Sequence, residues 1–342
     1  MRKRIIVGVA VFLSLVLLVS LGAGLHLSNR ISQAGGESFW DSREKAEHHV
    51  LVLLDDENQA YGEEFFQGLE AAAAEYRVAV EVMQLDGGNY EAEAVSALER
   101  ALFAKVDGVL LHGIRVESVV DKVALLQEEG IPVVTLLEDM PESRRAAHVG
   151  VNRYSVGQAA GESLVRSMEG VGKVAVIEQK SQGSRSEAEN PLLLGLRDVL
   201  RENPQIGLSL VKYSDKGVLG AETAAAEIFR ENPEINGIFC TDGQTTLGVV
   251  QFLVDRNLVG GVSLVGFGND QEILEYIEKG RIVDAAIRTD YSAIGWNAVL
   301  AYYEQKTDPK TYNYYTTEIQ VVDGENIQAQ IREMEDANGE NQ

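Results

Sequence analysis

The chain has 342 residues, of which 45% are hydrophobic and 24% are charged, a composition typical of a globular protein and not of a disordered or fibrous one. Its 53 acidic and 30 basic side chains give a net charge of −23, which repels the phosphates of a nucleic acid and makes such a partner unexpected. Cys240 is the single cysteine, so no intramolecular disulfide can form and stability must come from packing. At roughly 100–200 residues per domain, the length predicts about two domains.

An apolar segment lies close to the amino terminus. Residues 5–27 carry no charged side chain and follow the cations Arg2, Lys3 and Arg4. As a helix, the segment is long enough to cross about 30 Å of hydrocarbon. Because cations favour the cytoplasmic side, the rest of the chain is expected outside the cytoplasm. We predict that residues 1–27 are a transmembrane anchor in the cell membrane; the alternative is a cleaved signal segment and a secreted or periplasmic body.

The segments on either side of the body are polar. Residues 28–47 include two adjacent glycines and are expected to be a tether that holds the body away from the membrane. Residues 333–342 are expected to be a disordered tail. The folded body is therefore expected between these two segments.

Within the body, short strand-like runs alternate with helical stretches, the pattern typical of βαβ units and a parallel sheet. Runs rich in leucine or β-branched residues predict strands at residues 50–54, 78–85, 109–111, 133–136, 148–149, 173–177, 208–211, 238–240, 264–266 and 285–287. Ten strands are more than a typical single sheet contains, so we expect an α/β fold with more than one sheet.

Two parts of the body share one sequence pattern. Residues 106–111 and 235–240 each place a turn residue and a glycine before an apolar strand. His112 directly follows the first of these strands, and Thr241 and Asp242 follow the second. In open α/β sheets, ligands bind at the carboxyl ends of the strands. Two such sheets that face each other would form a cleft with polar groups from both sides.

The sequence contains no pattern that indicates catalysis, a metal or a cofactor. The segment Gly183-Ser184-Arg185 lacks the second glycine of a nucleophile elbow, and Cys240 ends an apolar strand, where a thiol is inert. His112 has no second histidine or cysteine at a metal-binding spacing. Gln271 stands where the third glycine of a dinucleotide-binding motif would follow residues 266–268. We therefore expect no enzyme activity, no catalytic residue, no metal and no cofactor.

The order of several motifs resembles that of the type 1 periplasmic binding proteins, the ribose and galactose type of ABC-transporter substrate-binding protein. The resemblance spans about residues 49–321 and rests on residues 50–54 with 58–61 and Gly68, 106–111, 130–134, 149–152 with Gly157 and Gly161, 238–242 with 247–248, and 265–267. It implies two Rossmann-like lobes joined by three crossovers, with a ligand held by hinge closure. Lobe 1 is expected at residues 48–150 with 290–317, and lobe 2 at residues 151–289 with 318–332.

The resemblance also implies a set of ligand-binding residues. Tyr61 stands where the family places an aromatic ring on a sugar face, and Asp242 stands where an Asn or Asp accepts hydrogen bonds from hydroxyl groups. Together with the other polar residues at strand ends, the expected ligand-binding residues are Asn58, Gln59, Tyr61, His112, Glu138, Asp139, Arg185, Asp242, Asn269, Asp270, Thr289 and Asp290.

The chain departs from the family pattern at three positions that usually bind the ligand. Leu137-Glu138 replaces an Asp-Arg pair, Leu192 lies near the position of a ligand-clamping arginine, and Gly268 replaces a carboxylate. Losing these directional bonds argues against a standard ribose or glucose pocket, although Arg185 is available as a substitute. The remaining acidic cluster of Glu138, Asp139, Asp242 and Asp270 favours a polyol or a cationic ligand.

The sequence therefore predicts an extracytoplasmic protein that closes on a small, sugar-like polar ligand and delivers it to the permease of an ABC importer. An alternative is that the closed protein acts as the ligand-sensing partner of a membrane histidine kinase. A transcriptional repressor is excluded because its helix-turn-helix would have to precede the lobes, where the apolar segment lies.

Overall fold

The computed structural model describes residues 46–55, 61–180, 186–280, 282–309 and 313–332. The predicted anchor, most of the predicted tether and the predicted tail lie outside the described residues, as do the site candidates Asn58, Gln59 and Arg185. Among the helices that are described, none combines the length and the hydropathy needed to span a bilayer.

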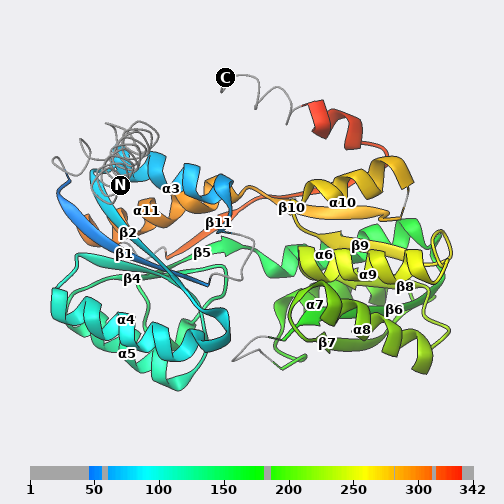
Figure 1. The fold of residues 1–342 in the computed structure, drawn as a ribbon, viewed down its shortest axis with the longest axis horizontal. Coiled ribbons are helices and arrows are strands. Elements are labelled where there is room, and N and C mark those ends of the chain that lie inside the picture. Colours follow the sequence, from blue (N-terminus) through cyan, green and yellow to red (C-terminus); the bar gives the residue numbers. More distant parts are fainter. Residues whose placement is uncertain (1–45, 56–60, 181–185, 281, 310–312, 333–342) are drawn as a thin grey trace, which may run out of the picture.

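The first lobe contains a parallel sheet with helices on both faces (Figure 1). Its strand order is β11-β5-β4-β3-β1-β2. The strands are β1 (His48–Asp55), β2 (Val78–Leu85), β3 (Gly108–His112), β4 (Val133–Leu136), β5 (Ala147–Val151) and β11 (Tyr314–Thr317). Helices α3 (Glu63–Glu75) and α11 (Tyr291–Thr307) cover one face, and α4 (Tyr90–Ala104) and α5 (Glu117–Glu128) cover the other.

The second lobe repeats this arrangement. Its strand order is β12-β10-β9-β8-β6-β7, and β12 alone is antiparallel to its neighbour. The strands are β6 (Gly172–Gln179), β7 (Ile206–Ser214), β8 (Gly237–Cys240), β9 (Ser263–Phe267), β10 (Ala285–Thr289) and β12 (Ile319–Asp323). Helices α6 (Arg153–Ser167) and α7 (Pro191–Glu202) cover one face, and α8 (Gly217–Glu231), α9 (Gly243–Asp255) and α10 (Gln271–Glu275) cover the other.

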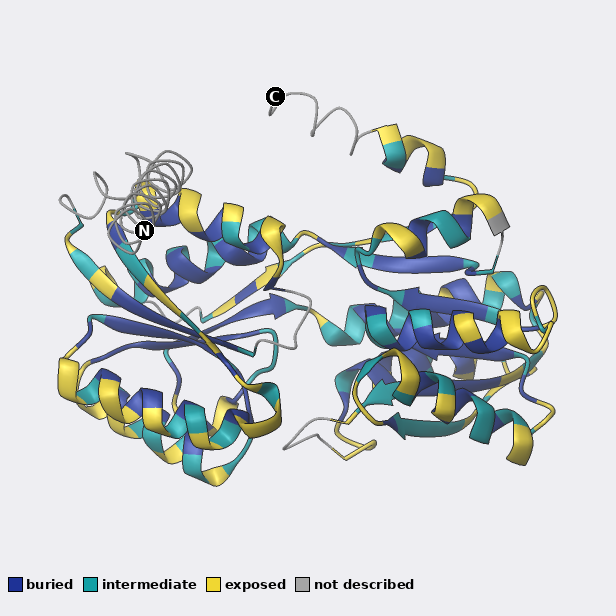
Figure 2. Ribbon diagram, in the orientation of Figure 1, coloured by how far each residue is buried: buried dark blue, intermediate teal, exposed yellow. Residues whose placement is uncertain are grey.

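The middle residues of the central strands are buried because helices cover both faces of each sheet (Figure 2). In β1, Val50, Val52 and Leu54 pack toward α3 and α11. The alternate residues Leu51 and Leu53 pack toward α4 and α5. The period of two places successive side chains on opposite faces, so one strand contributes to two cores.

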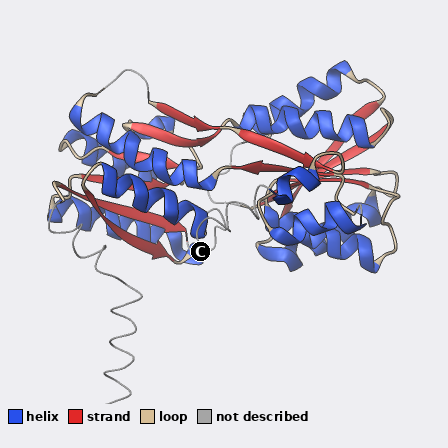
Figure 3. Cartoon of the chain, turned by 90° about the horizontal axis from the view of Figure 1, so that it is seen from above, coloured by secondary structure: helices blue, strands red, loops and turns tan. Residues whose placement is uncertain are grey.

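The ten predicted strands are all present, and the predicted two-lobe α/β fold is confirmed. The prediction missed the edge strands β11 and β12. In β11, Tyr314 and Thr316 are exposed, and the polar sequence of the strand carries no apolar run. The chain crosses between lobes after β5, after β10 and after β11 (Figure 3).

Close backbone contacts join a helix pair beside a lobe crossing in each lobe. In lobe 1, a Cβ atom on Gly68 of α3 would lie 1.9 Å from the carbonyl oxygen of Ser292 in α11. In lobe 2, a Cβ atom on Gly157 of α6 would lie 1.9 Å from the carbonyl oxygen of Leu192 in α7. Both α6 and α11 begin directly after a crossing, so these contacts fix the helices that follow two of the three connections.

We expect Gly68→Ala to destabilise the protein. The higher helix propensity of alanine would by itself stabilise α3 by about 1 kcal/mol, whereas the overlap with Ser292 forces the two helices apart at a cost of about 1–3 kcal/mol or more. Urea unfolding measures the net effect. Gly207→Ala is the control, because a Cβ atom there meets no atom within 4 Å. A Gly68→Ala variant more stable than the parent would contradict the close contact.

Candidate ligand-binding cleft

A cleft of about 680 Å³ lies between the two lobes, a volume within the usual range for small-molecule sites. In each sheet the strand order reverses beside the first strand of the lobe, between β1 and β3 and between β6 and β8. Asp55 and His112 lie at the first of these switch points, and Gln179 and Asp242 lie at the second. All four line the cleft, so the preferred ligand positions of two open α/β sheets meet in one space.

His112 enters the cleft from the end of β3 as a neutral imidazole. Its Nδ1 lies 2.7 Å from the hydroxyl oxygen of Tyr61. The Tyr90 hydroxyl donates a hydrogen bond of 2.9 Å to the His112 carbonyl oxygen. Burial lowers the pKa of His112 to about 4; the charge of Glu138 raises it and that of Lys216 lowers it further. The ring is therefore uncharged at neutral pH.

Tyr61 contacts the His112 ring from inside lobe 1 and does not line the cleft. The residue is 6% exposed, and its ring packs edge-on against Phe65 at 5.0 Å and against His112 at 5.6 Å. The sequence predicted that Tyr61 stacks on a ligand, but in the structure its ring packs against Phe65 and His112. The aromatic side chains that do line the cleft include Tyr90 and Tyr291.

Glu138 follows β4 and contacts the other lobe through Arg153. Leu137, at a φ of 60°, turns the chain, and a Cβ atom on Gly113 would lie 1.8 Å from the Glu138 carbonyl oxygen. The Arg153 guanidinium lies 3.9 Å from the Glu138 carboxylate and 3.3 Å from that of Glu178. One cation from the first turn of α6 thus links a carboxylate of each lobe.

Glu178 is a partly buried carboxylate that the sequence analysis did not identify. Burial raises its pKa, while the charge of Arg153 and a hydrogen bond of 3.1 Å from the Asn190 amide oppose that change. Arg153 was missed as well. The available signal was Asn152, which caps α6 immediately after β5 and so places the next side chain at a strand end.

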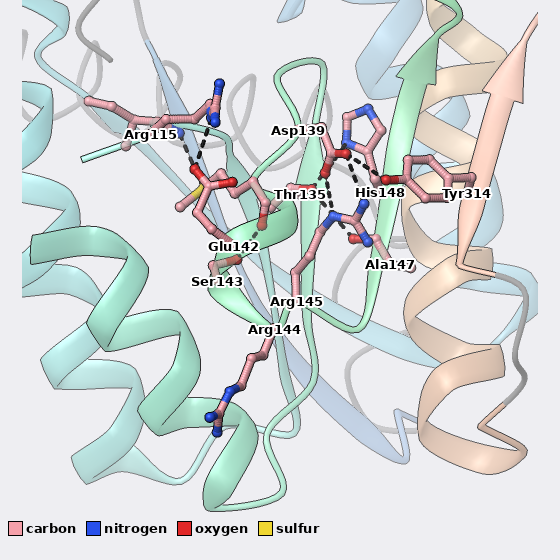
Figure 4. A network of polar contacts seen from close by, with 12 residues as sticks. Arg115, Thr135, Asp139, Glu142, Ser143, Arg144, Arg145, Ala147, His148 and Tyr314 are labelled. Atoms are coloured by element: carbon pink, nitrogen blue, oxygen red, sulfur yellow. Dashed lines mark hydrogen bonds and ion pairs between the residues drawn. The ribbon is translucent and has the colours of Figure 1, made fainter. Parts of the chain in front are cut away.

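Asp139 does not line the cleft, in contrast to the expectation that it contacts the ligand. It lies in a partly buried network of polar contacts in lobe 1 (Figure 4). Arg145 binds both of its carboxylate oxygens, and the Tyr314 hydroxyl donates to it at 2.9 Å. Burial acts to raise the pKa of Asp139, but the bond from Arg145 and the nearby His148 hold it below its usual value. Asp139 joins β4, β5 and β11, and its charge is already paired.

Two further carboxylates come from lobe 2. Asp242 caps α9 by accepting a hydrogen bond of 2.9 Å from the Thr245 amide. Burial raises its pKa, as does the charge of Asp270, against the hydrogen bonds from Thr245. Burial also raises the pKa of Asp270. Asp270 thus lies close enough to Asp242 to disfavour the charge of Asp242.

The lining of the cleft is acidic overall. Its described residues include seven carboxylates and three cations, a difference of four negative charges. The carboxylates are Asp55, Glu63, Glu64, Glu138, Glu178, Asp242 and Asp270, and the cations are Arg153, Lys180 and Lys216. Lys180 also pairs with Asp215 at 2.9 Å outside the cleft. Within the part of the chain that the structure describes, no group of three His, Cys, Asp or Glu side chains is arranged to hold a metal ion.

Asn269 connects the lobes on the side of the second crossing. Its amide nitrogen donates to the Glu64 carboxylate of α3 at 3.1 Å and to the Thr289 carbonyl oxygen at 2.8 Å. Asp290, the next residue, is exposed and caps α11 by accepting from the Ala293 amide at 2.8 Å. Asp290 therefore does not line the cleft, in contrast to the expectation from the sequence.

The structure thus divides the expected site residues into three groups. Those that line the cleft are His112, Glu138, Asp242, Asn269, Asp270 and Thr289. Those that lie elsewhere are Tyr61, Asp139 and Asp290. Asn58, Gln59 and Arg185 are outside the described residues.

Known proteins share both the sequence pattern and the fold. Residues 50–308 match the sequence model of the periplasmic binding protein domain. The D-allose-binding periplasmic protein of Escherichia coli is 24% identical over 241 residues, which are 68% of this chain and 76% of that protein.

Solved structures agree. GanP, a glucose-galactose binding protein from Geobacillus stearothermophilus, has a TM-score of 0.70 at 25% identity, over 82% of this chain and 98% of that chain. An ABC transporter solute-binding protein from Burkholderia graminis in complex with D-arabinose has a TM-score of 0.73 at 20% identity, over 83% and 97% of the two chains.

The matched segment covers most of the chain, and the structure has the two lobes that the motifs predicted. The relatives are sugar-binding proteins and not enzymes, which confirms the expectation of a chain without catalytic function. The protein belongs to the type 1 periplasmic binding protein family.

Proposed function

We propose that the chain binds a small, uncharged or cationic, polyhydroxylated ligand in the cleft between its lobes, outside the cytoplasm. The observation that carries this proposal is that the switch points of both sheets present polar side chains to one cavity, His112 from lobe 1 and Asp242 from lobe 2. The relatives named above are described as binding allose, glucose and galactose, or arabinose, which supports a sugar or a polyol as the ligand.

The charge of the cleft supports selection against anions. Carboxylates accept hydrogen bonds from hydroxyl or ammonium groups and repel other carboxylates. The charge of Asp270 already disfavours that of Asp242, and Arg153 is shared between two glutamates. Leu192 lies in the wall where the family pattern has a nearby arginine, so an apolar side chain stands there. A sugar acid would gain no free guanidinium at these positions.

We further propose that residues 5–27 anchor the protein in the cell membrane and that its ligand passes to the permease of an ABC importer. The uncharged run behind Arg2, Lys3 and Arg4 supports the anchor. The name of the Burkholderia graminis protein, an ABC transporter solute-binding protein, supports the importer. An anchored binding protein delivers its ligand by moving along the membrane that also holds the permease.

A ligand screen tests the binding proposal. We expect D-allose, D-arabinose, D-galactose, polyols or glucosamine to raise the unfolding temperature of the full-length chain, since a ligand at about 100 times its Kd stabilises by about 2.7 kcal/mol. Galacturonate and glucuronate are the matched anionic compounds and are expected to have no effect. Stabilisation by a sugar acid but not by its neutral counterpart would contradict the charge argument, and a flat screen would contradict the binding proposal.

We expect Asp242→Asn to weaken binding of the sugar found in that screen by roughly 10- to 100-fold, because a hydrogen bond to a charged group contributes about 1.5–3 kcal/mol. Asparagine is as good a helix cap as aspartate, so α9 keeps its start and the unfolding temperature should change little. Asp290→Asn makes the same substitution at the cap of α11, outside the cleft, and should leave the affinity within about twofold. Titration calorimetry measures both; equal affinities in the two variants would contradict the site.

The importer proposal predicts the partner. When the full-length chain is reconstituted in lipid vesicles with the permease and ATPase encoded beside its gene, the ligand should stimulate ATP hydrolysis several-fold. Deletion of residues 2–27 should release the chain from the vesicles and lower this stimulation, because the local concentration near the permease falls. Genes for a sensor kinase and response regulator at that locus, with ligand-dependent phosphorylation of the kinase, would instead support the sensing function.

A further inference from the structure

We propose that Tyr61 is a positioning residue that holds His112 as the tautomer protonated on Nε2, so that lobe 1 offers the ligand a directed N–H donor. The contact between the two side chains is seen in the structure. Its consequence for the ligand rests on the proposed binding function. The proposal assigns Tyr61 a role through His112 in place of a direct contact with a sugar.

The first step concerns the direction of the bond between the two side chains. The Tyr61 hydroxyl lies 2.7 Å from Nδ1 of His112, and the phenol is 6% exposed. A buried hydroxyl proton needs an acceptor. In the described part of the chain, Nδ1 is the acceptor within reach of this hydroxyl. The hydrogen bond therefore runs from Tyr61 to Nδ1, and a neutral imidazole that accepts at Nδ1 carries its proton on Nε2.

The second step concerns the protonation of the two groups. Burial raises the pKa of Tyr61 well above its usual value, with the charge of Asp55 acting in the same direction, so the phenol keeps its proton. His112 faces Glu138 from the loop after β4 and Lys216 from the start of α8. Its pKa of about 4 keeps the ring neutral over the physiological range. Neither partner changes its charge state near neutral pH.

The third step concerns the orientation of the ring. Tyr61 and Tyr90 both pack edge-on against the imidazole, each with ring centroids 5.6 Å from it. The Tyr90 hydroxyl also holds the His112 carbonyl oxygen at 2.9 Å. The two tyrosines thus restrict the ring and its backbone together. With Nδ1 occupied, Nε2 is the ring nitrogen left for the cleft that His112 lines.

The consequence is that the cleft has a hydrogen-bond donor, His112, in lobe 1 and an acceptor, Asp242, in lobe 2. The carboxylate oxygens of Asp242 in lobe 2 accept hydrogen bonds, whereas the Nε2–H group of His112 in lobe 1 donates one. A ligand that bridges His112 and Asp242 must therefore offer an acceptor oxygen to the histidine and a hydroxyl or ammonium donor to the aspartate. A sugar provides both, with its ring oxygen or a hydroxyl group as the acceptor.

Nitrogen-15 NMR of the histidine side chains in the full-length chain tests the tautomer. The His112 signals are assigned by their loss in His112→Gln. We expect His112 of the parent protein to carry its proton on Nε2 and to remain neutral down to about pH 5. In Tyr61→Phe we expect a mixture of both tautomers, because Nδ1 no longer receives a proton donor.

Tyr90→Phe is the matched control for the spectrum, since it removes a buried tyrosine hydroxyl that bonds to the carbonyl oxygen of His112 and not to its ring. Its His112 tautomer should be that of the parent. Thermal unfolding shows whether each variant is folded. A proton on Nδ1 in the parent protein, or the parent tautomer in folded Tyr61→Phe, overturns the proposal.

Titration with D-allose tests the consequence for binding. We expect Tyr61→Phe to lower the affinity about twofold, because in an equal mixture of tautomers only half of the molecules offer the Nε2–H donor. An unchanged affinity with a mixed tautomer overturns the role of His112 as a specificity-determining donor. If the parent protein binds no sugar at all, the proposed function fails, while the spectrum still decides whether Tyr61 holds the tautomer.

Discussion

Parallel strands end at a common edge of their sheet, and this constraint places the cleft. Side chains that are far apart in the sequence, such as Asp55 and His112, become neighbours because β1 and β3 are adjacent and parallel. The same pairing of β6 with β8 brings Gln179 and Asp242 together in lobe 2. Because the chain crosses three times between the sheets, these two edges line one cavity. Strand order therefore determines which positions of the sequence line the site, and the side chains at those positions give it its polar character.

The sequence predicted the fold well because the signals of this fold are local. Short runs rich in apolar residues mark strands that are buried on both faces, and all the strands predicted from such runs are present. Tyr314 and Thr316 in β11 lie at an exposed edge, where burial imposes no pattern, so no local signal marks that strand. The repeated phrase before His112 and Asp242 predicted two residues that line the same cleft, since both follow central strands.

The remaining site residues depend on orientation, which the sequence does not encode locally. Glu138 and Asp139 are adjacent, yet one lines the cleft and the other is bound by Arg145 beneath it. Tyr61 follows β1 by a few residues, as a ligand-stacking residue would, but its hydroxyl contacts the His112 ring. Arg153 was missed because its role comes from two carboxylates on different lobes. Such contacts exist only once the lobes are assembled.

The third connection between the lobes is a single residue long. β11 ends at Thr317 and β12 begins at Ile319, so only Glu318 separates a strand of one sheet from a strand of the other. So short a covalent bridge leaves a few backbone torsions free and no slack. The halves can rotate about this point but cannot slide or drift apart. Any opening of the cleft must therefore be angular, with the width of its mouth set by the angle between the two lobes.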